Sequence, residues 1–311
     1  MAQGKLIRRR RIRRRDLRDN AEYYLMMLPV IVLIIMFCYL PLFGVLIAFQ
    51  DYQPGRPFLG AKTVWVGLKW FKEFVSSFYF RRILRNTLYI NLLKLVMGFW
   101  VPIVFALLLN ELRFPRLKKT IQTLSYMPHF ISAVVVAGMV INFIQDDGII
   151  PQIINGMGGQ VKSLNTNEKA FPWIYVITTV WQGFGWSSIL YLSTLSGIDP
   201  GLYEAAEIDG ATRLQKIWYV TLPHMLPLIM IQLILSIGNI LASNTQQILL
   251  MYNESVYSTM DVIGTYVYRD ALRKGRFSYG SACGLLLSIM SFILVFIANK
   301  VSAKTTDFSL W

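Results

Sequence analysis

The feature that most constrains this chain is a set of six long stretches from which charged side chains are almost absent. Of all the Asp, Glu, Lys and Arg residues, only Lys94 falls inside them. About 20 apolar residues in a helix cross the roughly 30 Å hydrocarbon core of a bilayer, and each stretch reaches that length. The sequence therefore predicts an all-α integral membrane protein with six transmembrane helices, at residues 23–50, 86–110, 120–145, 170–198, 217–253 and 277–299.

Composition agrees with this fold class. Charged residues make up 15% of the 311 residues and hydrophobic residues 55%, whereas soluble domains average about 25% charged residues. A soluble enzyme and a disordered chain are excluded on this ground. The two cysteines, Cys38 and Cys283, both lie inside the apolar stretches. Because they have no metal-ligand spacing and no oxidising surroundings, we expect neither a disulfide nor a metal site.

Charges outside the stretches predict the orientation of the chain. Nine Lys and Arg residues precede the first stretch, and positive residues beside the first helix usually remain in the cytoplasm. Six crossings would return the C terminus to the same side. We therefore expect a basic cytoplasmic segment at residues 1–22 and one transmembrane domain at residues 23–311. The basic segment has no interleaved aromatic residues, so we expect it to contact anionic membrane lipid rather than nucleic acid.

The segment between the fourth and fifth stretches predicts two short helices joined by a glycine. Asp199 is a candidate N-cap with Pro200 at the first helical position, and Gly210 supplies a left-handed end to that helix. Thr212 and Gln215 have the spacing of a capping box that opens a second helix, which we expect to run to Pro223. The residues alone leave two interpretations open: a loop lying on the membrane, or a helix that sits in the groove of a partner.

Several residues of this segment match a known motif. Glu204, Ala205, Ala206, Asp209 and Gly210, followed by Leu222-Pro223, resemble the EAA loop in membrane subunits of binding-protein-dependent ABC importers, here at residues 199–223. Elsewhere the chain is similar to the carbohydrate branch of that family, closest to permeases for lipo-oligosaccharides and plant-polysaccharide oligosaccharides. The matching segments are Ile47–Tyr52, Asn86–Leu88, Leu109–Glu111, Met127–Ser132, Trp186–Ile189, Asp261–Arg269 and the terminal Ser309-Leu310-Trp311.

The resemblance implies a fold, a mechanism and a set of partners. The fold would be the type I ABC importer transmembrane domain, in a bacterial cell membrane. The loop would be the coupling helix, in which Glu204 makes the charged contact, Ala205 and Ala206 allow close docking, Gly210 makes the bend, and Leu222 and Pro223 anchor the return. The partners would be a second, non-identical permease, two ATPase subunits and an extracytoplasmic sugar-binding protein. No GxxxxGK[S/T] phosphate loop occurs in the sequence, so ATP and Mg would bind to the ATPase partner.

Polar and aromatic residues inside the stretches are candidates for the substrate pathway. Amides in hydrocarbon cost free energy unless they face protein or water, and aromatic faces stack on sugar rings. Each of these residues could equally make hydrogen bonds between helices. The candidates are Asn142, Gln145, Trp181, Gln182, Trp186, Tyr191, Asn239, Asn244, Gln246 and Gln247.

Lys94 lies eight residues inside a helix that begins at Asn86, and we expect it to snorkel or to make a structural contact. A proton or ion relay would need a partner carboxylate, and the six stretches contain no Asp or Glu. This absence disfavours a secondary transporter and an intramembrane enzyme. We expect no enzymatic activity in this chain, and the alternative function is an ABC importer permease for a solute other than a sugar.

Overall fold

The computed structural model describes residues 21–57, 59–60, 63–161 and 163–305. The terminal Ser309-Leu310-Trp311 and the predicted basic segment 1–22, except for its last two residues, lie outside these ranges. Within the described ranges the chain is helical and has no named β-strand; Gln50 and Trp65 form one isolated antiparallel bridge. The predicted all-α fold is confirmed.

Five helical stretches of the described residues are long and apolar enough to cross a membrane: Ala21–Phe49, Phe80–Asn110, Ala133–Gly156, Arg213–Gly238 and Phe277–Lys304. The predicted fourth crossing corresponds to α8 (Phe171–Ser196), a helix of 26 residues without a charged side chain. At 1.5 Å per residue α8 is about 39 Å long, enough for a bilayer. Its Trp, Thr, Ser and Gly residues make it less apolar than the other five.

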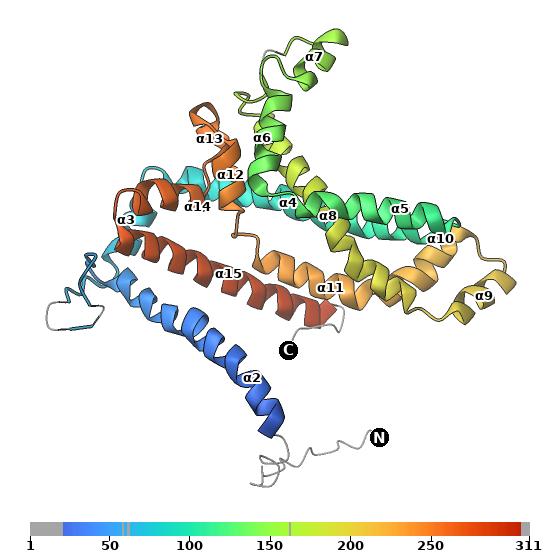
Figure 1. Cartoon of the computed structure of the whole chain (residues 1–311), viewed down its shortest axis with the longest axis horizontal. Coiled ribbons are helices and arrows are strands. Elements are labelled where there is room, and N and C mark those ends of the chain that lie inside the picture. Colours follow the sequence, from blue (N-terminus) through green and yellow to red (C-terminus); the bar gives the residue numbers. More distant parts are fainter. Residues whose placement is uncertain (1–20, 58, 61–62, 162, 306–311) are drawn as a thin grey trace.

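The first stretch is helical throughout but changes type along its length. The α-helix α2 (Ala21–Ile34) continues as a π-helical segment, Ile35–Tyr39, and as a 3-10 segment, Leu40–Phe49. None of the residues of α2 is buried by the rest of this chain. Figure 1 shows α2 diverging from the other helices toward its N-terminal end.

The core is built by long helices that lie side by side (Figure 1). Helix α4 (Phe80–Asn110) packs along α8, and α11 (Leu222–Gly238) packs along α15 (Phe277–Thr305). A close approach of helices is visible at Gly185 of α8, where a Cβ atom would lie 2.1 Å from the backbone oxygen of Ser125. Only glycine fits at that contact. Helix α3 (Lys69–Ser76) covers the end of the molecule where α15 begins.

Two of the predicted crossings are interrupted, which corrects the expectation of continuous helices. Residues 120–145 form the end of α5 (Pro115–Tyr126), a 3-10 turn at Met127–Phe130, and α6 (Ala133–Ile144). Proline at position 128 and the new N-cap at Ser132, whose hydroxyl accepts from the Val135 amide, explain the break.

Residues 217–253 are also divided. A helical run from α10 (Arg213–Lys216) through a π-helical turn into α11 ends at Gly238, and α12 (Thr245–Met251) starts after a non-helical segment. The Asn244 side chain caps α12 by accepting from the Gln247 amide. The predicted end of the second loop helix at Pro223 is wrong: the helical run continues past this proline, and the π-helical turn Ile217–Thr221 lies directly before it, where the regular hydrogen-bond pattern of the α-helix is already altered.

Shorter helices complete the structure at its periphery. Figure 1 shows α6 and α7 projecting sideways from the long helices, and α12 and α13 lying on the same side. The remaining elements are α7 (Ile149–Gly156), α9 (Pro200–Ile208), α13 (Tyr257–Met260), α14 (Ile263–Tyr266) and a π-helical segment, Val267–Leu272.

Candidate functional site

Helix α9 and the start of α10 form a hairpin whose backbone is fixed by local caps. The Asp199 carboxylate accepts from the Gly201 amide at 2.9 Å, and Pro200 follows it at the first helical position. At the other end Gly210 has φ +76°, a conformation that L side chains rarely adopt. The predicted caps at Asp199 and Gly210 are confirmed.

The second half of the hairpin begins with the predicted capping box. The Thr212 amide donates to Gln215 Oε1 at 2.7 Å, and the Thr212 hydroxyl accepts from the Gln215 amide at 3.4 Å. Across the hairpin, Lys216 Nζ lies 2.5 Å from Glu207 Oε1. This hydrogen bond and the positive charge of Lys216 lower the pKa of the Glu207 carboxyl. The two short helices are therefore held together by side chains as well as by backbone geometry.

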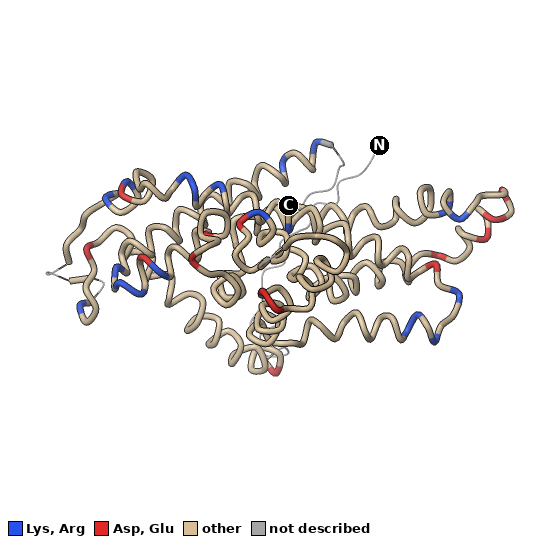
Figure 2. The backbone as a smooth tube through the Cα atoms, turned by 90° about the horizontal axis from the view of Figure 1, so that it is seen from above, with Lys and Arg blue, Asp and Glu red and all other residues tan. Residues whose placement is uncertain are grey.

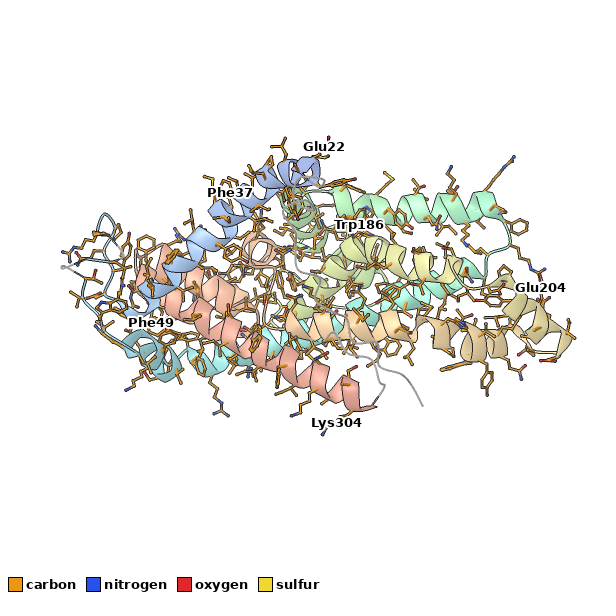
Figure 3. All side chains as sticks on the ribbon, turned by 90° about the horizontal axis from the view of Figure 1, so that it is seen from below. Glu22, Phe37, Phe49, Trp186, Glu204 and Lys304 are labelled. Atoms are coloured by element: carbon orange, nitrogen blue, oxygen red, sulfur yellow. The ribbon has the colours of Figure 1, made fainter. Side chains whose placement is uncertain are left out.

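The hairpin lies at one extremity of the molecule. In Figure 1 α9 occupies the end of the long axis opposite α3, and in Figure 3 Glu204 lies far from Phe49. Figure 2 shows acidic and basic residues gathered at this end. Glu204 and Ala205 are exposed and Ala206 is half-buried. Large apolar side chains beside them are also exposed: Ile208, Leu214, Trp218 and Tyr219.

The base of the hairpin is attached to the helix core. The hydroxyl groups of Tyr203 and Thr221 are 3.0 Å apart, and Thr221 is buried. Leu222 packs against a core cluster that includes Met225, whereas Pro223 is exposed. A displacement of α9 would therefore be transmitted to the start of α11.

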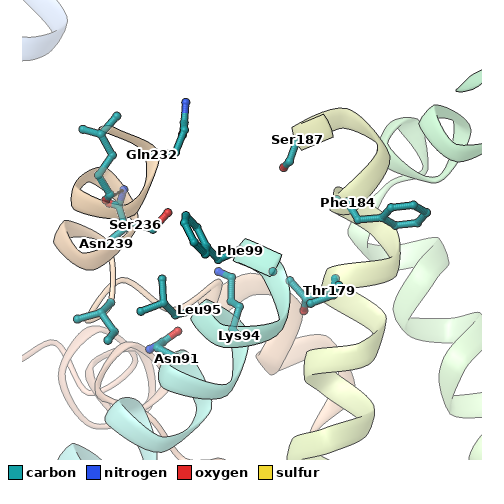
Figure 4. A pocket seen from close by; sticks show the side chains of 15 residues that line it. Asn91, Lys94, Leu95, Phe99, Thr179, Phe184, Ser187, Gln232, Ser236 and Asn239 are labelled. Carbon is teal, nitrogen blue, oxygen red and sulfur yellow. Dashed lines mark hydrogen bonds between the residues drawn. The ribbon is translucent and has the colours of Figure 1, made fainter. Parts of the chain in front are cut away.

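A second candidate site is a cavity of about 520 Å³ between α4, α8 and α11. Figure 4 shows Asn91 and Lys94 on α4, with Gln232, Ser236 and Asn239 on α11 and Thr179 and Ser187 on α8. An adjoining cavity of about 400 Å³ shares Gly98, Phe99, Ser187, Gln232 and Ser236 with it. Together the two cavities form a space between the helices that is lined by both polar and apolar side chains and has aromatic residues among its walls.

The predicted pathway residues fall into three groups in the structure. Asn239 lines the larger cavity, and Trp186 and Tyr191 line the smaller one. Gln182 and Gln247 make contacts to other segments instead: Gln182 donates to the Ile131 carbonyl at 2.9 Å and accepts from Gln247 Nε2 at 3.5 Å. Asn244 makes a local contact at the start of α12, where it donates to Gln247 Oε1 at 3.3 Å. The residues that line neither cavity and belong to no such contact are Asn142, Gln145, Trp181 and Gln246.

Trp186 has a further role in packing. Its ring stacks on His129 with centroids 4.7 Å apart and meets Phe130 edge-on at 5.7 Å. The 3-10 turn between α5 and α6 is thus held against α8 at the rim of the smaller cavity.

Sequence reasoning missed most of the polar residues of the cavity. Asn91, Thr179, Ser187, Gln232 and Ser236 were not among the candidates. The amides of Asn91 and Gln232 have mainly apolar neighbours in the sequence, in Tyr89–Leu93 and Met230–Leu235, and this local contrast was a usable signal. The hydroxyl residues carried no such signal, because Ser and Thr commonly bond to the carbonyl four residues earlier in membrane helices.

Comparisons with known proteins place this arrangement in context. Residues 98–307 match the family model described as "Binding-protein-dependent transport system inner membrane component". The chain is 40% identical over 282 residues to the polygalacturonan/rhamnogalacturonan transport system permease protein YteP of Bacillus subtilis (strain 168), covering 90% of this chain and 87% of that one. It is also 40% identical to the protein LplB of the same organism, covering 93% and 90% of the two chains.

Solved structures agree in fold over nearly the whole length. A chain of a bacterial ABC transporter involved in the import of the acidic polysaccharide alginate is 35% identical, with a TM-score of 0.84, over 94% of this chain and 98% of that chain. A chain of the bacterial alginate ABC transporter in complex with an alginate pentasaccharide-bound periplasmic protein is 34% identical, with a TM-score of 0.86, over 95% and 99%.

Proposed function

Since the chain belongs to the family of inner membrane components of binding-protein-dependent transport systems, we propose that it is a permease subunit of an ATP-driven importer of oligosaccharides. The observation that carries the proposal is the match over nearly the full chain, in sequence and in fold, to proteins of polygalacturonan/rhamnogalacturonan transport and alginate import. In this function the chain forms part of the translocation pathway and does not itself hydrolyse ATP.

The proposed topology has six crossings, with both termini in the cytoplasm of a bacterial cell. The five long apolar stretches together with the uncharged α8 support six crossings. The N-terminal cluster of Lys and Arg supports a cytoplasmic N terminus. Helix α2 leads toward the α3 end and α15 leads away from it (Figure 1), as termini on one side require. This orientation places α9 on the cytoplasmic side and α3 on the outer side.

The hairpin around α9 is proposed as the contact with the ATPase subunits, which bind ATP and Mg. Glu204 supplies charge, Ala205 and Ala206 leave room for close docking, and Gly210 with Asp209 makes the bend. The exposed apolar side chains beside the hairpin support this role, since such patches on a charged surface mark protein contacts. Leu222 and Pro223 lead the movement into α11. Because the hairpin is capped at both helices, it transmits displacement instead of absorbing it.

Two further partners are proposed. A second, similar permease would cover the apolar surface that this chain leaves exposed, including all of α2, and would complete the pathway as a heterodimer. An extracytoplasmic sugar-binding protein would dock at the α3 end. The alginate transporter with its bound periplasmic protein supports such an assembly. The pathway itself would run through the cavity lined by Asn239 and its neighbours.

The proposal is tested by reconstituting the complete complex in liposomes and measuring uptake of a labelled oligosaccharide delivered by the binding protein. We expect uptake that requires ATP on the cytoplasmic side and that persists when ionophores collapse all ion gradients. Uptake that is driven by an ion gradient without ATP would show that the chain is a secondary transporter.

A further inference from the structure

Lys94 is a charged side chain at the centre of a membrane helix. It lies near the middle of the 31-residue α4, between Phe80 and Asn110. About 20 Å of helix separates it from either end, which is farther than a lysine side chain can reach. The helix starts at Phe80 and not at Asn86, and the Lys94 side chain lines the cavity between α4, α8 and α11 (Figure 4). This position favours an interaction inside the protein over snorkelling.

Among the residues that the structure describes, this ammonium group has no counter-ion. None of the residues lining either cavity is an Asp or Glu. Across the residues that the structure describes, the ion pairs involve other side chains. An unpaired charge away from bulk water is costly, so charged residues inside membrane proteins usually serve a pathway or a ligand. The arrangement leaves Lys94 available to an anion that enters the cavity.

A second group beside Lys94 also lacks a partner. Asn91 is 3% exposed and lies one helical turn before Lys94. Its amide nitrogen donates to the Thr87 carbonyl and to the Ser243 hydroxyl, both at 2.8 Å. Its oxygen, Oδ1, is buried without a hydrogen-bond partner among the described residues. Buried acceptors are rarely left unpaired, and this oxygen could accept from a ligand only if neighbouring side chains moved to open it to the cavity.

The cavity therefore combines one positive charge with hydroxyl and amide groups and an aromatic edge at Phe99. Its volume of about 520 Å³ is within the range of about 300–1,000 Å³ typical of small-ligand pockets. A neutral sugar could bond to Gln232 and Asn239 but would leave the charge of Lys94 unpaired. A sugar that carries a carboxylate would satisfy all of them, because the carboxylate would pair with the ammonium group.

We propose that Lys94 selects carboxylate-bearing substrates, so that the cargo of this permease is an oligosaccharide of uronic acids. The inference rests on the proposed function and adds the charge of the substrate and the residue that recognises it. In this role Lys94 is a binding residue that contacts the cargo during its passage.

The test compares a charged sugar with its uncharged methyl ester. The complete complex is placed in nanodiscs without the binding protein, and calorimetry measures the affinity for trigalacturonate and for its methyl ester. We expect Lys94→Gln to weaken trigalacturonate binding about tenfold or more, because a charged hydrogen bond is lost, and to change methyl ester binding less than twofold. Lys94→Arg should retain the preference. Lys300→Gln is the matched control, since it removes an exposed lysine from α15.

Several outcomes would overturn the inference. These are an equal effect of Lys94→Gln on both sugars, no effect on either, or a wild-type complex that does not prefer the charged sugar. An equal effect is also expected if a carboxylate of the partner permease pairs with Lys94.

ATP-driven uptake by the wild-type complex is measured in parallel. If that uptake occurs while the charge preference is absent, the proposed function stands and the inference fails. If no ATP-dependent uptake occurs, the proposed function itself fails.

Discussion

At the scale of single residues, the two ends of the molecule depend on a few backbone and side-chain contacts. Gly210 is needed for its φ of +76° and not for space, since no atom lies within 4 Å of an added Cβ. At the opposite end Asp261 is fully buried and paired with Arg269, with Nη–Oδ distances of 3.1 and 2.9 Å. The Thr265 hydroxyl donates to the same carboxylate at 2.8 Å. The backbone conformation of Gly210 and the ion pair of Asp261 can each be tested by a substitution.

Replacing Gly210 with valine should uncouple transport from the ATPase. A non-glycine residue in the left-handed region costs roughly 1–2 kcal/mol, and a β-branched one is disfavoured further. We expect ATP-driven uptake to fall about tenfold or more while the complex still assembles, as judged by copurification of the ATPase subunits. Gly210→Asn, which tolerates the left-handed region, should keep most of the uptake. Wild-type uptake by the valine variant would contradict the proposed coupling role.

Replacing Asp261 with alanine should destabilise the end of the molecule where α3 lies. The change leaves the Arg269 guanidinium, 27% exposed, without its carboxylate, and a lost charged hydrogen bond costs about 1.5–3 kcal/mol. The thermal unfolding midpoint of the detergent-solubilised complex should fall by several degrees. Asp146→Ala, at an exposed carboxylate, is the control and should unfold at the wild-type temperature. An unchanged midpoint for Asp261→Ala would mean that the pair contributes little.

At the scale of elements, two uncharged stretches of the sequence are each divided into separate helices. At each division a polar side chain accepts a hydrogen bond from a free backbone amide at the start of the new helix. The break between α11 and α12 is capped by Asn244, and the break before α6 is capped by Ser132. The hairpin at α9 is the reverse case, because the short helix α9 is held against the start of the α10–α11 run by caps and by the Glu207–Lys216 pair. Its stability should therefore depend on the charge of Glu207.

The hairpin should loosen at acidic pH. The pKa of Glu207 is lowered in the folded hairpin, so the ionised form is favoured by folding. The contact therefore stabilises the hairpin above the ordinary pKa of a glutamate, and this stabilisation is lost as pH falls through the lowered value. Hydrogen–deuterium exchange of residues 199–216 should rise over that interval. In Glu207→Gln the pH-dependent rise should be absent; a rise of equal size in the variant would assign it to another group.

At the scale of the whole molecule, the long axis separates a cytoplasmic coupling end from an outer end, if the chain crosses the membrane six times. Apolar side chains cover the long helices between these ends, and α2 has no buried residue in this chain. Such exposed apolar helices are expected in a subunit whose peripheral helices face lipid and a second permease.

The six-crossing topology predicts opposite labelling of two exposed positions. Both native cysteines are first removed, and a maleimide that cannot cross the bilayer is added to intact cells. Ser255→Cys, in the turn before α13, should react with it from the outer side of the membrane. Thr212→Cys, in the hairpin, should react only after the membrane is permeabilised. Uptake by the cysteine-free background serves as the control for folding. Labelling of both positions in intact cells would contradict six crossings.

The sequence by itself determined the class of the molecule, its long helices and the caps of the hairpin. These features depend on local composition and on contacts between residues a few positions apart, such as Asp199 with Gly201 and Thr212 with Gln215. Uncharged runs of sufficient length leave the chain little alternative to membrane helices, because the bilayer requires backbone hydrogen bonds to be made internally.

Only the tertiary structure decided which polar residues share a cavity. Asn239 and Gln247 look alike in the sequence, yet one lines the cavity and the other bonds across helices. The sequence alone did not show which residues surround Lys94, and the structure places it on the wall of the cavity between α4, α8 and α11. These outcomes depend on how helices far apart in the sequence face one another, and the free energy of burying an amide or an ammonium group is set by those neighbours.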